Sequence, residues 1–302
     1  MGEGTGSRRE SLKWGATRVF LYTGIFALLL VVGGLAIPSV LDETADNLLA
    51  GSALTLGAAF VAGAVLLLRL DGRTVGAMGL AWTPAVPKEI GLGLGIGLAS
   101  IALAALLMFV TGGLGYTAQP GDLRDWLLVA GQAFAIFAIP AVAEEVLFRG
   151  YAFQVTVRVV GPVPGTIAAS ALFAIAHMAN PSAAPLGMVN IFLAGLLLSV
   201  AYLKTRSLWF PSALHLGWNW GMAGPLDLPV SGLELVDSPL YEPVISGSAW
   251  VTGAAFGPEG GVVGTIAFGA ALLAVWKLPA IRESPRMKEL RPIVDQDESG
   301  DT

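Results

Sequence analysis

The sequence predicts an all-α membrane protein that crosses the bilayer with about eight helices and keeps both termini in the cytoplasm. Three observations lead to this prediction. Of the 302 residues, 55% are hydrophobic and only 13% are charged, whereas a soluble domain has about 25% charged residues. Eight apolar stretches come close to the roughly 20 residues that a bilayer-spanning helix needs. The basic residues lie in alternate connections between these stretches, as the positive-inside rule requires of a multi-pass protein.

The eight stretches form one transmembrane domain, residues 19–278. A cytoplasmic segment, 1–18, precedes it, and a cytoplasmic polar tail, 279–302, follows it. The acidic end of this tail, from Ile293 onward, is expected to be disordered because it has little apolar surface to bury. The longest connection, 226–260, is acidic. The expected helices are 19–38, 48–68, 90–111, 126–146, 164–180, 185–203, 208–225 and 261–278.

The charge pattern supports this number of helices. With the N-terminus inside, every Lys and Arg except Arg124 falls on the cytoplasmic side, and a different number of helices would break the alternation. The cytoplasmic basic residues are Arg8, Arg9, Lys13, Arg18, Arg69, Arg73, Lys88, Arg149, Arg158, Lys204, Arg206, Lys277, Arg282, Arg286, Lys288 and Arg291.

The N-terminus places Arg8, Arg9 and Lys13 before the first apolar stretch, as a secretory signal peptide does. The stretch is longer than a signal-peptide core and has no clear small-residue cleavage site. We therefore expect it to be retained as the first membrane helix. The third stretch contains Gly91, Gly93, Gly95 and Gly97, two small-xxx-small pairs that we expect to form a helix-packing face.

Composition excludes several kinds of function. The chain has no cysteine, which excludes disulfides, thiolate metal sites and a cysteine nucleophile. Its net charge of −5 and pI near 5.1 argue against nucleic-acid binding. It also lacks a Gly-rich phosphate loop of the Walker type.

A few ionisable residues lie within the apolar stretches, where such groups are costly and are usually retained for function. Glu145 and Arg149 are four residues apart and share a helical face. Glu144 is rotated from them by about 100° and points elsewhere, for example into a cavity. The alternative is that both acids lie at a helix end and are merely solvated.

The chain has two histidines, His177 and His215. A single histidine on an apolar helix is more often a packing residue than a catalyst. His215 and Asn219 project from one helical face, where they could hold a metal, donate to an oxyanion or join two helices by a hydrogen bond. The neighbouring Trp218 and Trp220 are expected to be packing or interfacial anchors.

Together these residues are sufficient to hydrolyse a peptide bond. A carboxylate and a histidine can deprotonate a water molecule. A second histidine and an amide can stabilise the tetrahedral oxyanion. Hydrolysis within a bilayer also requires a wet cavity, which polar groups facing the interior of a helix bundle would supply.

Three motifs follow in order on three of the expected helices: Glu144-Glu145…Arg149, Phe173…His177 and His215…Asn219. They match the pattern EExxxR, FxxxH and HxxxN or HxxxD, and they resemble the CPBP family of intramembrane proteases. This family includes the type II CAAX prenyl endopeptidase and bacterial Abi and bacteriocin-immunity proteins. The resemblance covers about 126–225.

The resemblance implies an eight-helix, all-α membrane fold with a site that opens to the cytoplasm. It implies that Glu144 and His177 activate the attacking water and that His215 and Asn219 form the oxyanion hole. Glu145 and Arg149 would be supporting residues that fix the end of the helix and tune Glu144. Whether a divalent metal such as zinc takes part stays open: Glu144, His177 and His215 would be enough ligands for zinc, yet the short H-E-x-x-H arrangement is absent.

The expected function is that of a CAAX-protease-like intramembrane endopeptidase that cleaves membrane-associated proteins or peptides near the cytoplasmic leaflet. The Ala/Gly-rich, cysteine-free chain is typical of a prokaryotic cell-membrane protein. Two alternatives stay open: a non-catalytic scaffold or bacteriocin-immunity-type binding protein, and a proton-coupled transporter, which the lack of a repeated half disfavours.

One observation conflicts with a single site. Counted at about 1.5 Å per residue, Glu144, His177 and His215 lie at different depths below the cytoplasmic ends of their expected helices.

Overall fold

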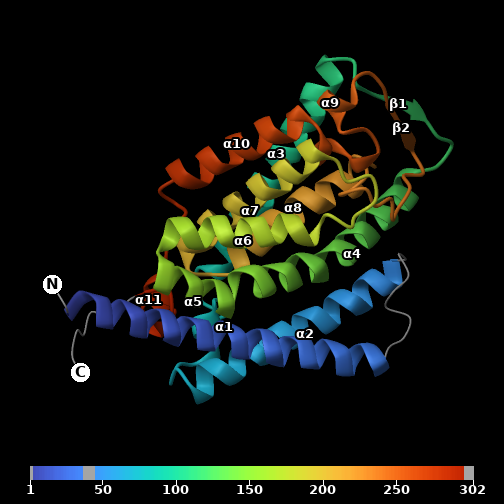
Figure 1. Ribbon diagram of the computed structural model, residues 1–302. Coiled ribbons are helices and arrows are strands. Elements are labelled where there is room, and N and C mark those ends of the chain that lie inside the picture. Colours follow the sequence, from blue (N-terminus) through green and yellow to red (C-terminus); the bar gives the residue numbers. More distant parts are fainter. Residues whose placement is uncertain (1–2, 37–44, 296–302) are drawn as a thin grey trace.

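The computed structural model describes residues 3–36 and 45–295 and shows a bundle of long helices (Figure 1). The remainder of the predicted polar tail, 296–302, lies outside the described residues. The long elements are α1 (Glu3–Ala36), α2 (Ala45–Arg69), α3 (Val86–Val110), α4 (Leu123–Arg149), α5 (Tyr151–Val160), α6 (Pro162–Ala176), α7 (Pro185–Thr205), α8 (Trp209–Ala223) and α10 (Val262–Lys277). The short elements are η2 (Val75–Met78), α9 (Ala249–Thr252), η3 (Ala254–Phe256), η4 (Pro258–Gly260), α11 (Pro285–Leu290), β1 (Leu114–Ala118) and β2 (Tyr241–Ile245).

The helical, multi-pass character predicted from the sequence is confirmed. Among the described residues, five segments are long and apolar enough to cross a membrane: α1, α2, α3, α7 and the continuous segment that contains α4 and α5. The helices α6 and α10 are apolar but shorter, and α8 has 15 residues. The full number of eight spans therefore stays a prediction.

The purely α-helical prediction is wrong in one detail. Strands β1 and β2 form a two-stranded antiparallel sheet in which Leu114 pairs with Ile245 and Ala118 with Tyr241. The first strand follows α3, and the second belongs to the acidic connection after α8. Both lie at one end of the bundle, away from α11 (Figure 1), where their backbone groups pair with each other outside the apolar helices.

The expected connection between the fourth and fifth helices, 147–163, is also wrong. Instead of a loop, the chain forms α5 directly after Gly150 and turns into α6 at Gly161, whose φ of +92° favours glycine. Helices α5 and α6 pack against each other as a hairpin. The helical path through α4 and α5 is therefore longer than one span, which changes the depth of every residue on it.

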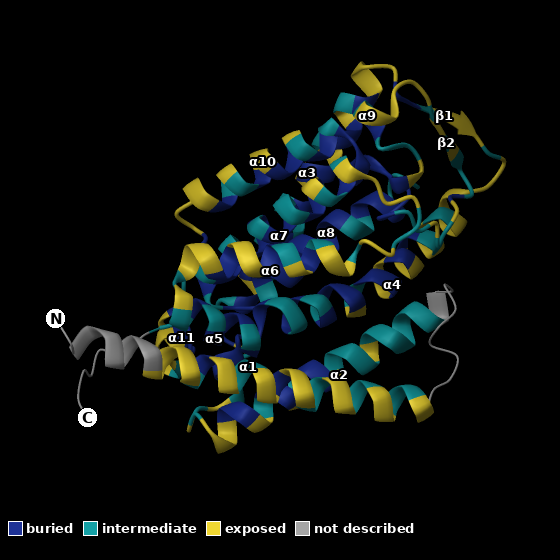
Figure 2. Ribbon diagram, viewed as in Figure 1, coloured by how far each residue is buried: buried dark blue, intermediate teal, exposed yellow. Residues whose placement is uncertain are grey.

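Close packing of α3 on α8 depends on glycine. A Cβ atom on Gly93 or Gly97 would clash with backbone atoms of α8, whereas one on Gly91 or Gly95 would meet nothing within 4 Å. The predicted helix-packing face is thus confirmed for the pair Gly93/Gly97 and wrong for the pair Gly91/Gly95. Nearly all of α8 is buried, while α1 exposes much of its length (Figure 2).

The start of the expected disordered tail is ordered. Ile293 and Val294 are buried, and the Ile293 backbone N–H donates to Gln154 Oε1 at 2.8 Å. The amide of Gln154 in turn donates to the carbonyl of Met78. These contacts hold the chain at Ile293 against α5 and η2. The expectation of disorder from Ile293 onward is therefore wrong for residues 293–295.

Candidate active site

The structure brings Glu144, His177 and His215 together from three different elements. Glu144 lies on α4, His177 directly follows α6, and His215 lies on α8. Glu144 Oε2 is 3.8 Å from His177 Nε2 and 3.9 Å from His215 Nε2. Asn219, one helical turn beyond His215, lines the same cavity. The four side chains of the predicted site therefore share one cavity.

The α5–α6 hairpin explains how these depths match. Glu145 and His177 lie equally far along the chain from Gly161, one before it and one after it. Because both arms of the hairpin are helical apart from the break at Gly150, residues rise by about 1.5 Å in each arm and the two positions return to a similar level. The conflict in depth arose from assuming that α4 ends at the membrane surface.

Glu145 and Arg149 form a buried support beside these residues. Arg149 Nη1 donates to Glu145 Oε1 at 3.0 Å, and neither side chain is exposed. The guanidinium also donates to the carbonyl of Gly195 and lies 4.6 Å from the centre of the Phe173 ring. Its charge is thus paired, hydrogen-bonded and packed, which a buried guanidinium requires.

The hydrogen bonds of the two imidazoles fix which nitrogen faces the cavity. His177 Nδ1 donates to the Phe173 carbonyl at 2.8 Å, so its Nε2 carries the lone pair that faces Glu144. His215 Nδ1 lies 3.2 Å from Glu145 Oε1 and donates to this carboxylate. The Phe173 ring packs 4.5 Å from the His177 ring and helps to orient it.

Glu144 Oε2 is buried and accepts no hydrogen bond from any protein donor. Its distances to the two imidazole nitrogens exceed the limit of a direct hydrogen bond. Polar atoms separated in this way are commonly bridged by water. The carboxylate oxygen therefore faces two imidazoles across a space suited to a water molecule.

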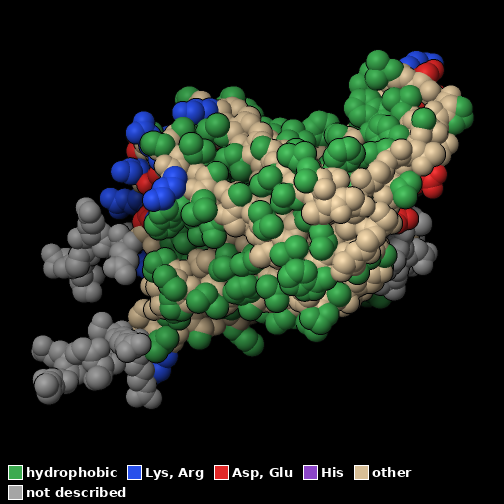
Figure 3. All heavy atoms as spheres, turned by 90° about the horizontal axis from the view of Figure 1, so that it is seen from above, with side chains coloured by type: hydrophobic (Ala, Val, Ile, Leu, Met, Phe, Trp, Pro, Cys, Tyr) green, Lys and Arg blue, Asp and Glu red, His purple; other side chains and the backbone are tan. Residues whose placement is uncertain are grey.

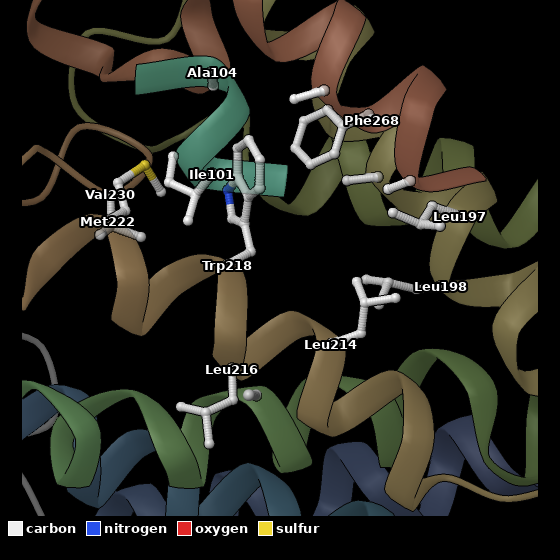
Figure 4. Packing of buried hydrophobic residues seen from close by; sticks show 14 of the residues in the cluster. Ile101, Ala104, Leu197, Leu198, Leu214, Leu216, Trp218, Met222, Val230 and Phe268 are labelled. Carbon is white, nitrogen blue, oxygen red and sulfur yellow. The ribbon is translucent and has the colours of Figure 1, made fainter. Parts of the chain in front are cut away.

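The cavity around this oxygen has a volume of about 690 Å³, which includes the space at its mouth that is open to solvent. Its walls are mostly apolar and come from α4, α7, α8 and α10. Figure 4 shows the packing of Leu197, Leu198, Leu214, Trp218 and Phe268 around the same part of the bundle. Polar groups enter it only at a few points, as is usual for a binding site.

Residues 126–221, about a third of the chain, match a family model described as type II CAAX prenyl endopeptidase Rce1-like. They include all three motifs of the site. This region is Rce1-like. The resemblance to the CPBP family and its CAAX proteases is thereby confirmed, and it supports protease activity in general. No curated protein and no solved structure matches the chain.

A second carboxylate, Glu259 of η4, also lines this cavity, although it lies outside the Rce1-like region. Its Oε1 accepts a hydrogen bond from Trp218 Nε1 at 2.8 Å, and its Oε2 accepts one from Ser231 Oγ at 2.5 Å. Asn190 Nδ2 donates to the carbonyls of Glu259 and Gly261 and holds this segment against α7. We name Glu259, Trp218, Ser231 and Asn190 the outer cluster.

Sequence reasoning missed Glu259, Ser231 and Asn190. Glu259 lies in an irregular, Gly-rich segment without hydrophobic periodicity, and nothing in its neighbours predicts that the segment folds back into the bundle. Trp218 was expected to be a packing anchor. Its ring does pack 4.3 Å from the Phe268 ring, but its indole N–H also holds Glu259.

Glu144, His177 and His215 would be the ligands of a metal ion in this region, but they do not form a metal centre as they stand. Among the described residues, no three His, Asp or Glu side chains gather closely enough to hold a metal ion. The Nε2 atoms of His177 and His215 lie 3.8 and 3.9 Å from Glu144 Oε2. We therefore derive no catalytic step through zinc.

Proposed function

We propose that the protein is an intramembrane endopeptidase that hydrolyses peptide bonds of membrane-associated proteins or peptides. One observation carries this proposal: a buried carboxylate oxygen without a protein hydrogen-bond donor faces two imidazoles from separate helices. Such a group costs free energy in a folded protein and is retained where it reacts. The Rce1-like region supports the same class of activity.

In the proposed mechanism, Glu144 is the general base and His177 Nε2 helps to hold the water. Glu144 takes one proton as the water oxygen attacks the carbonyl carbon of the scissile bond. The tetrahedral intermediate then breaks its C–N bond, and the proton on Glu144 moves to the leaving amine. The products are a carboxylic acid and an amine, and the Glu144 carboxylate is regenerated.

The oxyanion of this intermediate would be stabilised by His215 and Asn219, which face the same cavity one helical turn apart. Because His215 Nδ1 donates to Glu145, its Nε2 can donate to the oxyanion only when the ring carries both protons. The carboxylates of Glu144 and Glu145 stabilise that positive charge. Arg149 pairs with Glu145 and holds this carboxylate beside the ring.

We further propose a topology of eight spans in a prokaryotic cell membrane, formed by α1, α2, α3, α4 with α5, α6, α7, α8 and α10, with both termini in the cytoplasm. On the face shown in Figure 3, Lys and Arg side chains gather at one end of the molecule. This is the basic end, which includes Lys204, Arg206, Lys277, Arg282 and Arg286. The positive-inside rule places it in the cytoplasm.

Substitution of Glu144 tests the proposed activity. The variant Glu144→Gln keeps the size of the side chain and removes the base, so kcat/KM should fall by about 10²–10⁴. The assay compares reconstituted wild type and variant on a library of lipid-anchored, fluorescence-quenched peptides. The matched control is Glu242→Gln, an exposed acid on β2 that should leave cleavage unchanged.

Two results would contradict the proposal. Cleavage by Glu144→Gln at the wild-type rate would remove Glu144 from the mechanism. Loss of cleavage on treatment with a metal chelator, restored by zinc, would contradict the proposed steps, because these steps use no metal ion. A biological phenotype that survives Glu144→Gln would favour the scaffold or immunity function.

A further inference from the structure

We propose that the protein binds the headgroup of an ethanolamine phospholipid in a second cavity, with the ammonium group on Glu89 and the phosphate on Lys88 and Arg282. No described residue lines both this cavity and the catalytic one. Binding of the lipid does not depend on proteolysis, nor on which side of the membrane faces the cytoplasm.

The second cavity lies at the basic end, between the start of α3, the α7–α8 turn and the segment that joins α10 to α11. It has a volume of about 580 Å³, which includes the space at its mouth that is open to solvent. Leu92, Phe210 and Ile281 form apolar parts of its wall. Helix α3 begins at Val86 and α10 ends at Lys277. The cavity therefore lies where two apolar helices end, which is the level of the lipid headgroups on either side of a bilayer.

Glu89 supplies the buried charge of this cavity. It lies in the first turn of α3 and is 7% exposed, and neither of its carboxylate oxygens accepts a hydrogen bond from a described residue. The Ser207 hydroxyl lies beside it but outside hydrogen-bond geometry. The positive end of the α3 dipole favours an anion here, yet a carboxylate buried without donors costs free energy. A ligand that brings a positive charge and N–H donors would satisfy Glu89.

Two cations stand at the rim of the cavity, above this buried acid. Lys88 and Arg282 both line it and are both exposed. No hydrogen bond or ion pair joins either of them to another described residue. The cavity therefore has a negative group at depth and two positive groups at its mouth. An ethanolamine phospholipid has the matching order of charges: a terminal ammonium, two carbons and an ester oxygen, and then the phosphate, which Lys and Arg bind.

Glu283 is the remaining charged residue of the lining. Its Oε1 atom is also buried and accepts no hydrogen bond from a described residue. Arg206 and Lys288 lie near enough to offset its charge, while Asp295 opposes them. With Lys88 and Arg282 against Glu89 and Glu283, the lining carries two charges of each sign. A headgroup of no net charge, with one ammonium and one phosphate, fits such a lining.

Other ligands fit the same groups less well. A choline headgroup has no N–H to donate to Glu89, and a glycerol headgroup has no positive charge. A serine headgroup would bring a second carboxylate beside Glu89. A metal ion or the side chain of a substrate lysine would be repelled by Lys88 and Arg282 at the mouth. Among the described residues, no three His, Asp or Glu side chains gather closely enough to hold a metal ion.

The face of α3 below Lys88 offers a path for the acyl chains of the lipid. Lys88, Gly91, Gly95, Ala99 and Ala102 follow one another at helical spacing, and all five are exposed. A Cβ atom on Gly91 or Gly95 would meet nothing within 4 Å. A chain attached to a phosphate at Lys88 can therefore lie along this shallow stripe, which gives the second glycine pair a role that packing against α8 does not.

Lipid binding to the intact full-length protein in mild detergent tests the proposal. Synthetic ethanolamine, choline and glycerol phospholipids with identical acyl chains are added in turn, and the bound lipid is counted by mass spectrometry of the intact complex. We expect the wild type to bind one ethanolamine phospholipid about 10–100-fold more tightly than the other two, because only this headgroup donates charged N–H groups to Glu89.

Two variants separate the ammonium from the phosphate. Glu89→Gln removes a buried charge that no residue pairs, so it should fold, and it should weaken ethanolamine lipid by about tenfold and leave the other two unchanged. Lys88→Gln, at an exposed position, should weaken ethanolamine and glycerol lipids alike. The matched controls are Glu242→Gln on β2 and Arg124→Gln on α4, both exposed, which should bind as the wild type does.

Equal binding of the three lipids by the wild type would overturn the proposal, as would a preference for ethanolamine lipid that Glu89→Gln keeps. A preference for glycerol lipid would mean that only the cations at the rim bind, and thermal stabilisation by magnesium or calcium without lipid, lost in Glu89→Gln, would mean a metal site. Either result would also overturn it. Glu144→Gln should bind lipid as the wild type does, so a failure of the proposed protease function would leave this assay unaffected.

Discussion

Two buried carboxylate clusters line one cavity, and they differ in how well their oxygens are satisfied. In the outer cluster, both oxygens of Glu259 accept a hydrogen bond, one from Trp218 and one from Ser231. In the motif cluster, the Glu144 side chain is 29% exposed, but its Oε2 atom is buried and accepts no hydrogen bond, and two imidazoles lie just beyond hydrogen-bond reach. A satisfied carboxylate holds structure together, whereas an unsatisfied one is available for reaction.

The two carboxylates of the motif cluster differ in what surrounds their oxygens. Glu145 Oε1 is shared by Arg149 and His215; Glu145 Oε2 and Glu144 Oε2 both lack a protein hydrogen bond, but Glu144 Oε2 lies close to both imidazole Nε2 atoms. The rotation of about 100° between adjacent helical positions separates these tasks. The comparison therefore predicts large stability effects at Arg149, intermediate ones at Glu259 and a loss of activity with little loss of stability at Glu144.

The largest effect on stability is expected for Arg149→Met. This change leaves Glu145 buried without its counter-charge, which should lower the free energy of unfolding by about 3–5 kcal/mol. Unfolding in detergent micelles, followed by circular dichroism, would measure it. The control Lys88→Met, an exposed basic residue, should be nearly neutral.

The double variant Glu145→Gln/Arg149→Met separates a charge effect from a packing effect. Because it removes both charges, it should recover part of the stability that Arg149→Met loses. If the double variant were as unstable as the sum of the two single variants, the ion pair would not be the cause. In either case its cleavage rate should stay low, since His215 loses its carboxylate partner.

A smaller effect is expected in the outer cluster. Glu259→Ala leaves the Trp218 N–H and the Ser231 hydroxyl without an acceptor in a buried site, at a cost of about 1–3 kcal/mol. Glu259→Gln keeps one acceptor oxygen and should recover most of this stability. Cleavage by Glu259→Gln should stay within a few fold of wild type, and a loss as large as that of Glu144→Gln would show that the comparison is wrong.

The smallest effect is expected at Asp227, an acidic residue outside the spans. Burial raises the pKa of Asp227 to about 6, further supported by the carboxylates of Asp237 and Glu234 and opposed by the N–H of Ser238. Since the folded-state pKa lies above the ordinary 3.8, the folded state binds the proton more tightly. Stability should therefore fall as the pH rises from about 4 to about 6.

Asp227→Asn removes this dependence and keeps the oxygen that accepts from the Ser238 N–H. The variant should match the wild type near pH 4 and exceed it at pH 8 by about 1 kcal/mol or less, because the side chain is partly exposed. Thermal unfolding at both pH values measures this, with Glu10→Gln, exposed on α1, as the control. An equal pH dependence in wild type and Asp227→Asn would remove Asp227 as its cause.

The sequence predicted the motif cluster because its chemistry is local. Glu145 and Arg149 share a face by helical spacing alone, as do His215 and Asn219. It could not predict the outer cluster, because Asn190, Ser231 and Glu259 meet through an irregular connection whose fold depends on the helices that it covers. The same holds for β1 and β2, whose pairing joins segments far apart in the chain.

By itself, the sequence determined the membrane environment, the helical class and the residues able to carry out the proposed chemistry, because hydropathy and helical periodicity act over short distances. Only the tertiary structure decided that α5 extends α4 past Gly150, that Glu144 and two histidines meet at one level, and that Glu259 joins the same cavity. The physical reason is that these outcomes depend on where a helix ends and how its neighbours pack, and such energies belong to the assembled bundle rather than to any one segment.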